Sequence, residues 1–297
     1  MVDYIADYMG DVRARRVVPD VTPGFLSDAL PREAPVAGAP WDSVMRDFER
    51  LILPGVAHSQ SPHMHAYSAV HSPPALLGDM LAGALNCLSF TWDLSPACTE
   101  LDAIVTDWLA GALGLPAHFL NAAPRSPGGG VFQNTSSEAL LVTLLSARER
   151  AVQKHGDLGD LGGRLVAYCS DQAHPIVAKG CRMCRIQLHV VHSDEEYALR
   201  GDRLREAIAS DRQMGLVPFY MCATLGSTFA CSFDNLSELG PVCASEGVWL
   251  HVDAAYAGTA FACPEFRGWL AGVEHADSLS FLPCKIMLVN FYSCVMW

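Results

Sequence analysis

The sequence predicts an α/β fold with a largely parallel sheet. From about residue 137 onward, short apolar segments typical of strands alternate with longer segments of helical periodicity. Strands that alternate with helices form βαβ units, in which helices cover both faces of a parallel sheet. Half of the residues are apolar, so the chain can fill the core of such a domain.

The first 75 residues follow a different pattern. Short helical stretches are interrupted by proline-rich turns such as VVPDVTPGF and LPREAPVAGAPW. This pattern predicts an N-terminal arm, residues 1–75, that needs another surface to pack on. Residues 76–297 are then expected to form one large domain.

The large domain is expected to begin with helices. Residues 76–88 are mostly apolar and small, and Ser95-Pro96 suits the N-cap and first position of a following helix. One face of that helix would carry Ala97, Leu101, Ile104, Val105, Trp108, Leu109 and Ala112. The later elements are expected in this order: a helix from Ser137, strands at 164–169 and 186–191, a helix over about 200–213, a strand at 217–223, a helix over about 235–245, a strand at 248–253 and short apolar runs at 278–282 and 286–291.

The charge balance argues against nucleic acid as a partner. The chain has 20 basic and 32 acidic residues, a net charge of −12, whereas phosphate backbones require clustered Lys and Arg. The first residues include Asp3 and Asp7 and do not resemble a signal peptide, and no apolar stretch reaches the roughly 18 residues of a membrane span. Eleven cysteines in such a chain are typical of reduced cytosolic thiols, so we expect a cytoplasmic protein.

Two short motifs contain metal-ligand residue types, and we expect no metal at either. Cys181 and Cys184 form a CxxC, but no second CxxC or HxxxH follows at zinc-finger spacing, so two ordinary thiols are expected. The segment His63-Met64-His65 is expected to line a pocket or to serve packing.

A glycine run and a row of hydroxyl groups precede the helix expected from Ser137. Gly128-Gly129-Gly130 is followed by Thr135, Ser136 and Ser137. Hydroxyls and unpaired backbone N–H groups at the positive end of a helix bind phosphate well. An ordinary N-cap behind a flexible loop explains the same residues. The segment is not a Walker motif, because it lacks the GK[ST] ending.

Three further residues follow apolar segments. Asp253 ends the strand expected at 248–253. A buried carboxylate needs a cation or several hydrogen-bond donors, so Asp253 is expected to bind a cationic group. Capping of the next segment is the alternative role. Lys285 is the one lysine of three in a strongly apolar setting, which suits Schiff-base chemistry, and a lysine that extends to solvent from a strand edge is the alternative. His174 could stack on a flat ring or serve a structural role.

Together these features suit one ligand, pyridoxal 5'-phosphate (PLP), which has a phosphate, an aldehyde and a basic ring nitrogen that typically pairs with Asp.

Long segments extend this interpretation nearly end to end. They are MVDYIADY, RRVVPDVTPGF, LPGVAHSQSPHMHAY, LLGDMLAGALNCLSFTW, SPACTELDAIVTDWL, RLVAYCSDQAH, LVPFYMCATLGST, FDNLSELGP, WLHVDAAYAGTAFACPEFR and ADSLSF. They resemble the group II PLP-dependent amino-acid decarboxylases, which include histidine, aromatic-L-amino-acid and tyrosine decarboxylases. HMHAY, NCLSFTW and FRGWLAGVEHADS are more similar to the histidine branch than to the dopa branch.

The resemblance implies a fold and a set of site residues. The fold would be type I of the PLP-dependent transferases (aspartate aminotransferase-like), with residues 76–297 as part of the PLP-binding large domain. Lys285 would bind the cofactor aldehyde, Asp253 would pair with the pyridine nitrogen, and His174 would stack on the ring. The remaining expected site residues are Thr135, Ser136, Ser137 and Thr228 around the cofactor, Ala255 under the ring, and Tyr67 at the substrate.

The resemblance also implies an activity and a partner. The expected protein is a carboxy-lyase that converts L-histidine to histamine and carbon dioxide. An aromatic L-amino acid such as dopa or tyrosine is the alternative substrate, and a truncated, catalytically inactive paralogue or fragment is the alternative class. Family members are intertwined homodimers, and residues 1–75 resemble the part that clasps the partner.

The sequence departs from the family pattern at several positions. Leu282 stands where the family has an Asn that bonds the phosphate, and loss of that bond would cost about 1–3 kcal/mol, or about 5- to 150-fold in affinity. Cys284 is closer in size to the Ser of the histidine branch than to the His of the dopa branch. Ser59 replaces a Trp, and Asp93-Leu94 replaces a pair of small residues. The resemblance further implies that a catalytic loop with a proton-donating tyrosine, and the small C-terminal domain, are missing after Trp297.

Overall fold

The computed structural model describes residues 1–64, 70–124, 126, 128–156, 158–291 and 293–297. The chain divides into two compact units, Met1–Val70 and His71–Trp297, and each is described by itself. Tyr67 lies outside the described residues, so its expected place at the substrate stays a prediction.

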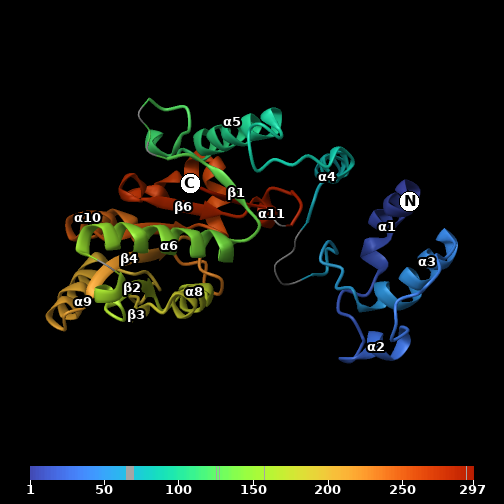
Figure 1. The fold of residues 1–297 in the computed structure, drawn as a ribbon, viewed down its shortest axis with the longest axis horizontal. Helices are drawn as coiled ribbons and strands as arrows, with labels where there is room; N and C mark the ends of the chain where they lie inside the picture. Colours follow the sequence, from blue (N-terminus) through green and yellow to red (C-terminus); the bar gives the residue numbers. More distant parts are fainter. Residues whose placement is uncertain (65–69, 125, 127, 157, 292) are drawn as a thin grey trace. The chain divides into compact units, whose positions relative to one another are not determined.

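The first unit consists of short helices joined by turns. Its helices are α1 (Val2–Asp11), α2 (Phe25–Ala29) and α3 (Trp41–Asp47) (Figure 1). An open apolar pocket of about 420 Å³ is lined by Met1, Tyr4, Ile5, Tyr8, Trp41, Val44, Met45, Phe48, Leu53 and Val56. No apolar side chain in the described part of this unit is buried, so its own core contributes little to its stability.

A seven-stranded sheet forms the centre of the second unit. The strand order is β1, β7, β6, β5, β4, β2, β3. In that order the bounds are Val131–Gln133, Cys294–Met296, Ser278–Phe281, Trp249–Asp253, Val217–Thr224, Leu165–Ser170 and Gln187–Val191. The five strands from β6 to β3 pair in parallel, whereas β7 pairs antiparallel with both β6 and β1. The largely parallel sheet is therefore confirmed, and the predicted strands between residues 164 and 282 agree within one residue at each end.

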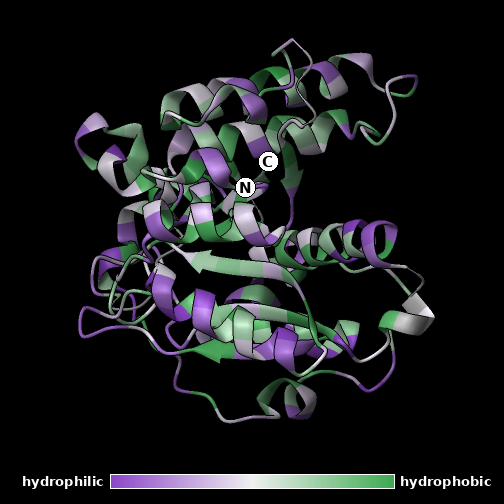
Figure 2. Ribbon diagram, turned by 90° about the vertical axis from the view of Figure 1, so that its left-hand side faces the viewer, coloured by the Kyte–Doolittle hydropathy of each residue, from purple (hydrophilic) through white to green (hydrophobic). Residues whose placement is uncertain are grey.

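Helices cover both faces of this sheet, as predicted. On one face, α6 (Ser136–His155) and α8 (Ile176–Cys184) pack on β2 and β4. On the other face lie α5 (Pro96–Leu113), α9 (Gly201–Gln213) and α10 (Leu236–Glu246). Figure 2 shows hydrophobic residues along the strands and hydrophilic residues on the outer sides of the helices. None of the described helices is long and apolar enough to cross a membrane.

The buried positions of α5 differ from the apolar face that the sequence indicated. The buried side chains are Thr106, Ala110 and Leu113, which point to the sheet. Leu101 and Trp108, on the predicted face, are 54% and 70% exposed. The preceding helix α4 (Pro73–Leu85) also presents leucines to solvent, as does the segment between the two helices. Helical periodicity identifies an apolar face, but it cannot say whether the same chain covers that face.

The segment around Lys285 also differs from the prediction. The apolar run at 286–291 is not a strand; Lys285 lies in a short helix, α11 (Pro283–Ile286), followed by irregular backbone. Pro283 occupies the first position of this helix, and Leu288 adopts a left-handed conformation with φ of 57°, which is incompatible with a strand. The strand that follows is β7, whose three residues were too few to give a sequence signal.

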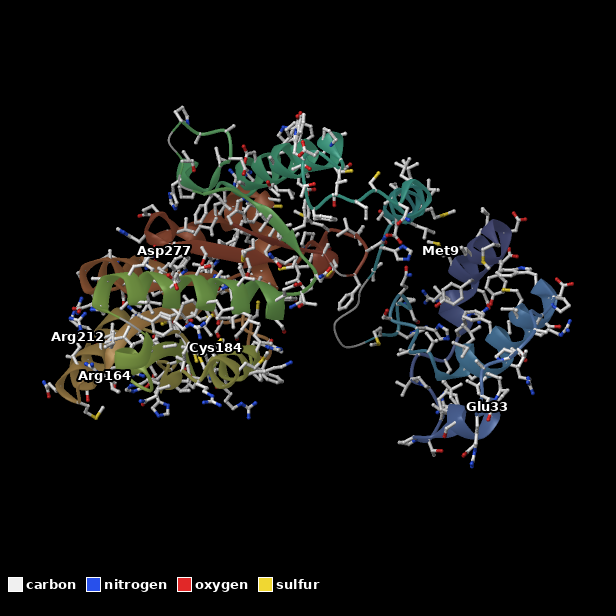
Figure 3. All side chains as sticks on the ribbon, viewed as in Figure 1. Met9, Glu33, Arg164, Cys184, Arg212 and Asp277 are labelled. Atoms are coloured by element: carbon white, nitrogen blue, oxygen red, sulfur yellow. The ribbon has the colours of Figure 1, made fainter. Side chains whose placement is uncertain are left out.

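Two long helices are fixed by polar contacts at their ends. The Thr135 side chain accepts the Glu138 N–H, and the Glu138 carboxylate accepts the N–H of Asn134, the residue before the N-cap; this is a variant of the capping box at the start of α6. Near the other end of α6, Arg150 pairs with Asp277 at 2.5 Å, and Asp277, which is labelled in Figure 3, also accepts the Leu250 N–H. These contacts hold α6 along the sheet between β1 and the start of β6.

The CxxC lies in α8, a helix that the sequence did not predict. Cys181 is buried and Cys184, labelled in Figure 3, is half-buried at the end of the helix. Burial raises the pKa of both thiols, that of Cys181 to about 12. Both side chains therefore stay protonated at neutral pH, as expected of ordinary packing thiols.

Candidate cofactor site

Asp253 lies at the carboxyl end of β5 and is buried, with 5% of its surface exposed. Its Oδ1 accepts the Ala255 N–H at 3.0 Å. Burial raises the pKa of this carboxyl group above its ordinary value, and the Ala255 N–H and the charges of Lys285 and His174 offset this only in part. The structure thus brings together three of the predicted site residues, from β5, α11 and the loop before α8.

Lys285 is half-buried on α11, close to the same strand end. Its Nζ lies 5.9 Å from the centre of the Tyr256 ring, over the ring face. Tyr256 follows β5 by three residues, so one short loop carries both an acid and an aromatic surface beside the lysine. The sequence analysis did not single out Tyr256, although it lies in the quoted segment WLHVDAAYAG.

The residues on either side of Lys285 pack into a small apolar cluster. Leu282 and Cys284 are 9% and 1% exposed, and they pack with Ala139 of α6 and with Cys294 and Met296 of β7. Ala255, expected under the cofactor ring, is half-buried at the edge of this cluster. The cluster holds α11 against the first turns of α6, so the lysine and the hydroxyl-bearing helix start lie on one side of the sheet's end.

Three hydroxyl residues begin α6, and they have different surroundings. The Thr135 hydroxyl oxygen is used as the N-cap acceptor, although its hydrogen can still be donated. The Ser136 Oγ is buried and has no nitrogen or oxygen partner among the described residues; it interacts with the Cys294 thiol, whose pKa burial raises to about 12. Ser137 is exposed. A thiol is a weak hydrogen-bond acceptor, so Ser136 is suited to a ligand whose oxygen accepts its hydrogen bond.

The glycine run before β1 serves close packing. A Cβ at Gly129 would collide with the Asn121 side chain, and one at Gly130 would collide with Thr106 of α5. The run is therefore a tight segment between β1 and α5, and neither the phosphate site nor the flexible loop considered from the sequence is needed to explain it.

His174 and Thr228 are placed at the same edge of the sheet. His174 is exposed in the loop after β2, and its Nδ1 accepts the Ile176 N–H at 3.2 Å, which places the ring proton on Nε2 and leaves the ring face open. Thr228 is half-buried in the loop after β4. A residue that the sequence analysis missed, Thr224, ends β4 with a buried and unpartnered hydroxyl. Its position at the end of a predicted strand was the available signal.

These residues fit PLP in three respects and depart from it in one. Asp253 is a buried acid available to a pyridine nitrogen, Lys285 supplies an amine, and Ser136 supplies a buried hydroxyl at a helix start. The departure is Leu282, which fills with apolar atoms the place where an amide was expected. An α/β fold with this acid and this lysine at one sheet edge defines a PLP-dependent protein of fold type I.

Comparison with known proteins identifies the family. The sequence model of the pyridoxal-dependent decarboxylase conserved domain matches residues 23–297, and the chain belongs to this family. The chain is 55% identical to human histidine decarboxylase and 54% identical to that of Drosophila melanogaster, over all of this chain and 46% and 36% of those proteins. It is 48% identical to bovine aromatic-L-amino-acid decarboxylase, of which it spans 62%.

A solved structure agrees with this assignment. Catharanthus roseus tryptophan decarboxylase in complex with L-tryptophan superposes with a TM-score of 0.95 at 42% identity, over all of this chain and 64% of that one. Oryza sativa TDC with PLP superposes equally well at 39% identity. The chain thus spans less than two thirds of each of these relatives.

Proposed function

We propose that this chain carries the cofactor-binding part of a PLP-dependent carboxy-lyase that converts L-histidine to histamine and carbon dioxide. The observation that carries the proposal is the burial of Asp253 at the carboxyl end of β5, where the charge of Lys285 acts on the pKa of its carboxyl group. The higher identity to the histidine decarboxylases than to the aromatic-L-amino-acid decarboxylase supports histidine as the substrate.

Each site residue has a proposed task. Asp253 would bind the protonated ring nitrogen; burial raises the pKa of its carboxyl group, and the Ala255 N–H and the charge of Lys285 oppose that effect. Lys285 would hold the aldehyde group of the cofactor. His174 would cover one face of the ring, and Ala255 would lie against the other. Thr135, Ser136, Ser137 and Thr228 bind the phosphate, and Tyr67 faces the substrate. The bound cofactor supplies an acceptor for the electron pair that the departing carboxylate leaves behind.

Two alternatives have specific support. Decarboxylation of an aromatic amino acid is favoured by the superposition on tryptophan decarboxylase and by the 48% identity to bovine aromatic-L-amino-acid decarboxylase. A catalytically inactive protein is favoured by Leu282, which removes a phosphate-binding amide from the site.

We also propose a homodimer in which residues 1–75 clasp the partner. Within the second unit, α4 and α5 expose large apolar side chains, namely Leu77, Leu81, Leu85, Leu101, Ile104 and Trp108. Surfaces of this kind mark protein interfaces, and a second copy of the chain is the occupant that the family resemblance implies. A cytoplasmic location is proposed as well, since all eleven cysteines lie in the described part of the chain and carry free thiols.

Borohydride reduction tests the cofactor site directly. The purified chain is incubated with PLP, its visible absorption is recorded, and the reduced adduct is located by peptide mass spectrometry. We expect the label on Lys285; K285A should lose it, whereas the matched variant K179A should keep it. A label on Lys154 or Lys179, or no label, contradicts the proposal.

Carbon dioxide release from histidine, dopa and tyrosine then separates the substrate classes. Release from histidine supports the main proposal, and release from dopa or tyrosine supports the aromatic alternative. A chain labelled on Lys285 that releases none from any of the three supports the inactive alternative.

A further inference from the structure

The hydroxyl group of Thr224 is buried and has no hydrogen-bond partner among the described residues. Thr224 is the last residue of β4 and is 6% exposed. Its backbone N–H is satisfied by Asp234, at 2.7 Å. Threonine hydroxyls in protein cores are normally paired, so an orphaned one at the ligand-binding edge of a sheet calls for an explanation.

The strand register places Thr224 directly beside Asp253. The two residues are Cα partners in the parallel pair of β4 and β5. Neighbouring strands lie about 4.8 Å apart, and residues paired in this way project their side chains to the same face of the sheet. The hydroxyl of Thr224 therefore lies across from the carboxylate that we propose binds the ring nitrogen.

The Asp253 carboxylate has acceptor capacity to spare. Within the described part of the chain, the Ala255 N–H is the one hydrogen bond that it accepts. An ionised carboxylate has about four acceptor positions, so a second donor can bind without displacing the first or blocking a ring N–H. The single hydrogen bond from the Ala255 N–H leaves the plane of the carboxylate free to rotate. A second donor, on the neighbouring strand, would fix that plane.

Asp234 is the competing partner. Its two carboxylate oxygens already accept the Thr224 and Leu199 N–H groups, at 2.7 and 2.9 Å. A Thr224 hydroxyl turned towards Asp234 would reinforce this turn and would leave the ligand site unchanged. If the Thr224 hydroxyl donates to Asp253, it affects how the protein binds the ring nitrogen of a ligand. If it donates to Asp234, it does not.

We propose that Thr224 is a positioning residue, whose hydroxyl donates to the ionised Asp253 carboxylate and orients it towards the ring nitrogen of the cofactor. The inference rests on the proposed function, because it assumes that Asp253 meets such a nitrogen. Thr224 would thus orient the Asp253 carboxylate, whereas Thr228 and the start of α6 are proposed to bind the phosphate.

Equilibrium dialysis with PLP and with 1-deaza-PLP, which lacks the ring nitrogen, tests the inference. We expect the wild-type chain to bind PLP more tightly than the deaza analogue. T224V should weaken PLP binding by about 5- to 30-fold, the loss of one hydrogen bond to a charged group, and should leave the deaza analogue within about threefold. T224S, which keeps the hydroxyl, should bind PLP about as tightly as the wild-type chain does.

The matched control is T143V. The Thr143 hydroxyl is also buried, but it bonds the Tyr220 hydroxyl, four residues before Thr224 in β4. T143V should leave the preference for PLP over the deaza analogue unchanged, and thermal unfolding of each ligand-free variant reports whether it folds. If T224V weakens both ligands equally, or neither, Thr224 serves the fold or Asp234 and the inference is overturned. If the wild-type chain does not distinguish the two ligands, the pairing of Asp253 with the ring nitrogen fails instead.

Discussion

Leu282 packs against Ala139, so an apolar side chain fills the space between α11 and the hydroxyl-bearing start of α6. The other members of this cluster are Cys284, Cys294 and Met296. Leu282 can offer no hydrogen bond to a phosphate at that position. The buried Ser136 hydroxyl and the N-terminal N–H groups of α6 would then carry more of the phosphate binding.

Replacing Leu282 with Asn should strengthen PLP binding. The restored amide is expected to add one hydrogen bond to a charged group, which corresponds to a decrease of about 5- to 150-fold in the PLP dissociation constant. Equilibrium dialysis measures the effect. L282A is the control, because it opens the same space without adding a donor; equal affinities for L282N and L282A would refute the explanation.

The capping box at the start of α6 should contribute to stability without any ligand. T135A removes the side-chain acceptor of the Glu138 N–H, and a loss of about 1 kcal/mol is expected, or about 2–4 °C in the melting temperature. T135S keeps the acceptor and should melt close to the wild type. Differential scanning calorimetry of the PLP-free proteins makes the comparison. A T135A protein as stable as the wild type would show that α6 is held by its packing alone.

Asp234 should make the chain less stable as the pH rises from about 4 to about 6. Burial raises the pKa of this carboxyl group to about 6, although the Thr224 and Leu199 N–H groups lower it. The native state then binds a proton more tightly than the unfolded state, so its stabilising contribution is complete below pH 4 and is lost by about pH 6. The change is about 3 kcal/mol at most.

Urea unfolding at pH 4, 5, 6 and 7 measures this dependence. D234N cannot titrate, so its unfolding free energy should vary less with pH than that of the wild type, even though one N–H group loses its acceptor. D202N, at an exposed position of α9, should keep the wild-type profile. An unchanged slope in D234N would assign the dependence to other groups.

The exposed apolar surface of α4 and α5 should hold the dimer together. W108E places a charge at a side chain that is 70% exposed, so it should shift a dimer towards monomer and leave the melting temperature of the monomer nearly unchanged. Sedimentation velocity measures the species. M214E, at a methionine that is 66% exposed after α9, is the control and should remain dimeric. A W108E protein that sediments as the wild type does would place the interface elsewhere.

The sequence predicted the parallel part of the sheet because its strands are long, buried and bounded by turns. β1 and β7, of three residues each, escaped detection because periodicity needs more residues than that. α8 was missed although its buried positions, Val177, Gly180 and Cys181, follow helical spacing, because the helix has only nine residues and contains a glycine.

The candidate site was predictable for a different reason. Asp253, His174 and Thr135 each follow a strand or begin a helix, and the carboxyl ends of parallel strands meet at one edge. The use of Thr135 as an N-cap, the orphaned Thr224 hydroxyl and the apolar cluster around Leu282 were not predictable, because each depends on contacts between residues far apart in the chain.

The pairing of β1 with β7 has a consequence for the order of folding. Val131 lies opposite Met296, so about half of the chain must be synthesised after β1 before β1 can pair with β7. The parallel strands β2 to β6 need no such wait, since each pairs with a neighbour closer in sequence. Contacts of such long separation form slowly. In a ribosome-bound chain stopped before residue 294, the backbone N–H groups of β2 and β4 should therefore be protected from hydrogen exchange. Those of β1, just before α6, should still exchange.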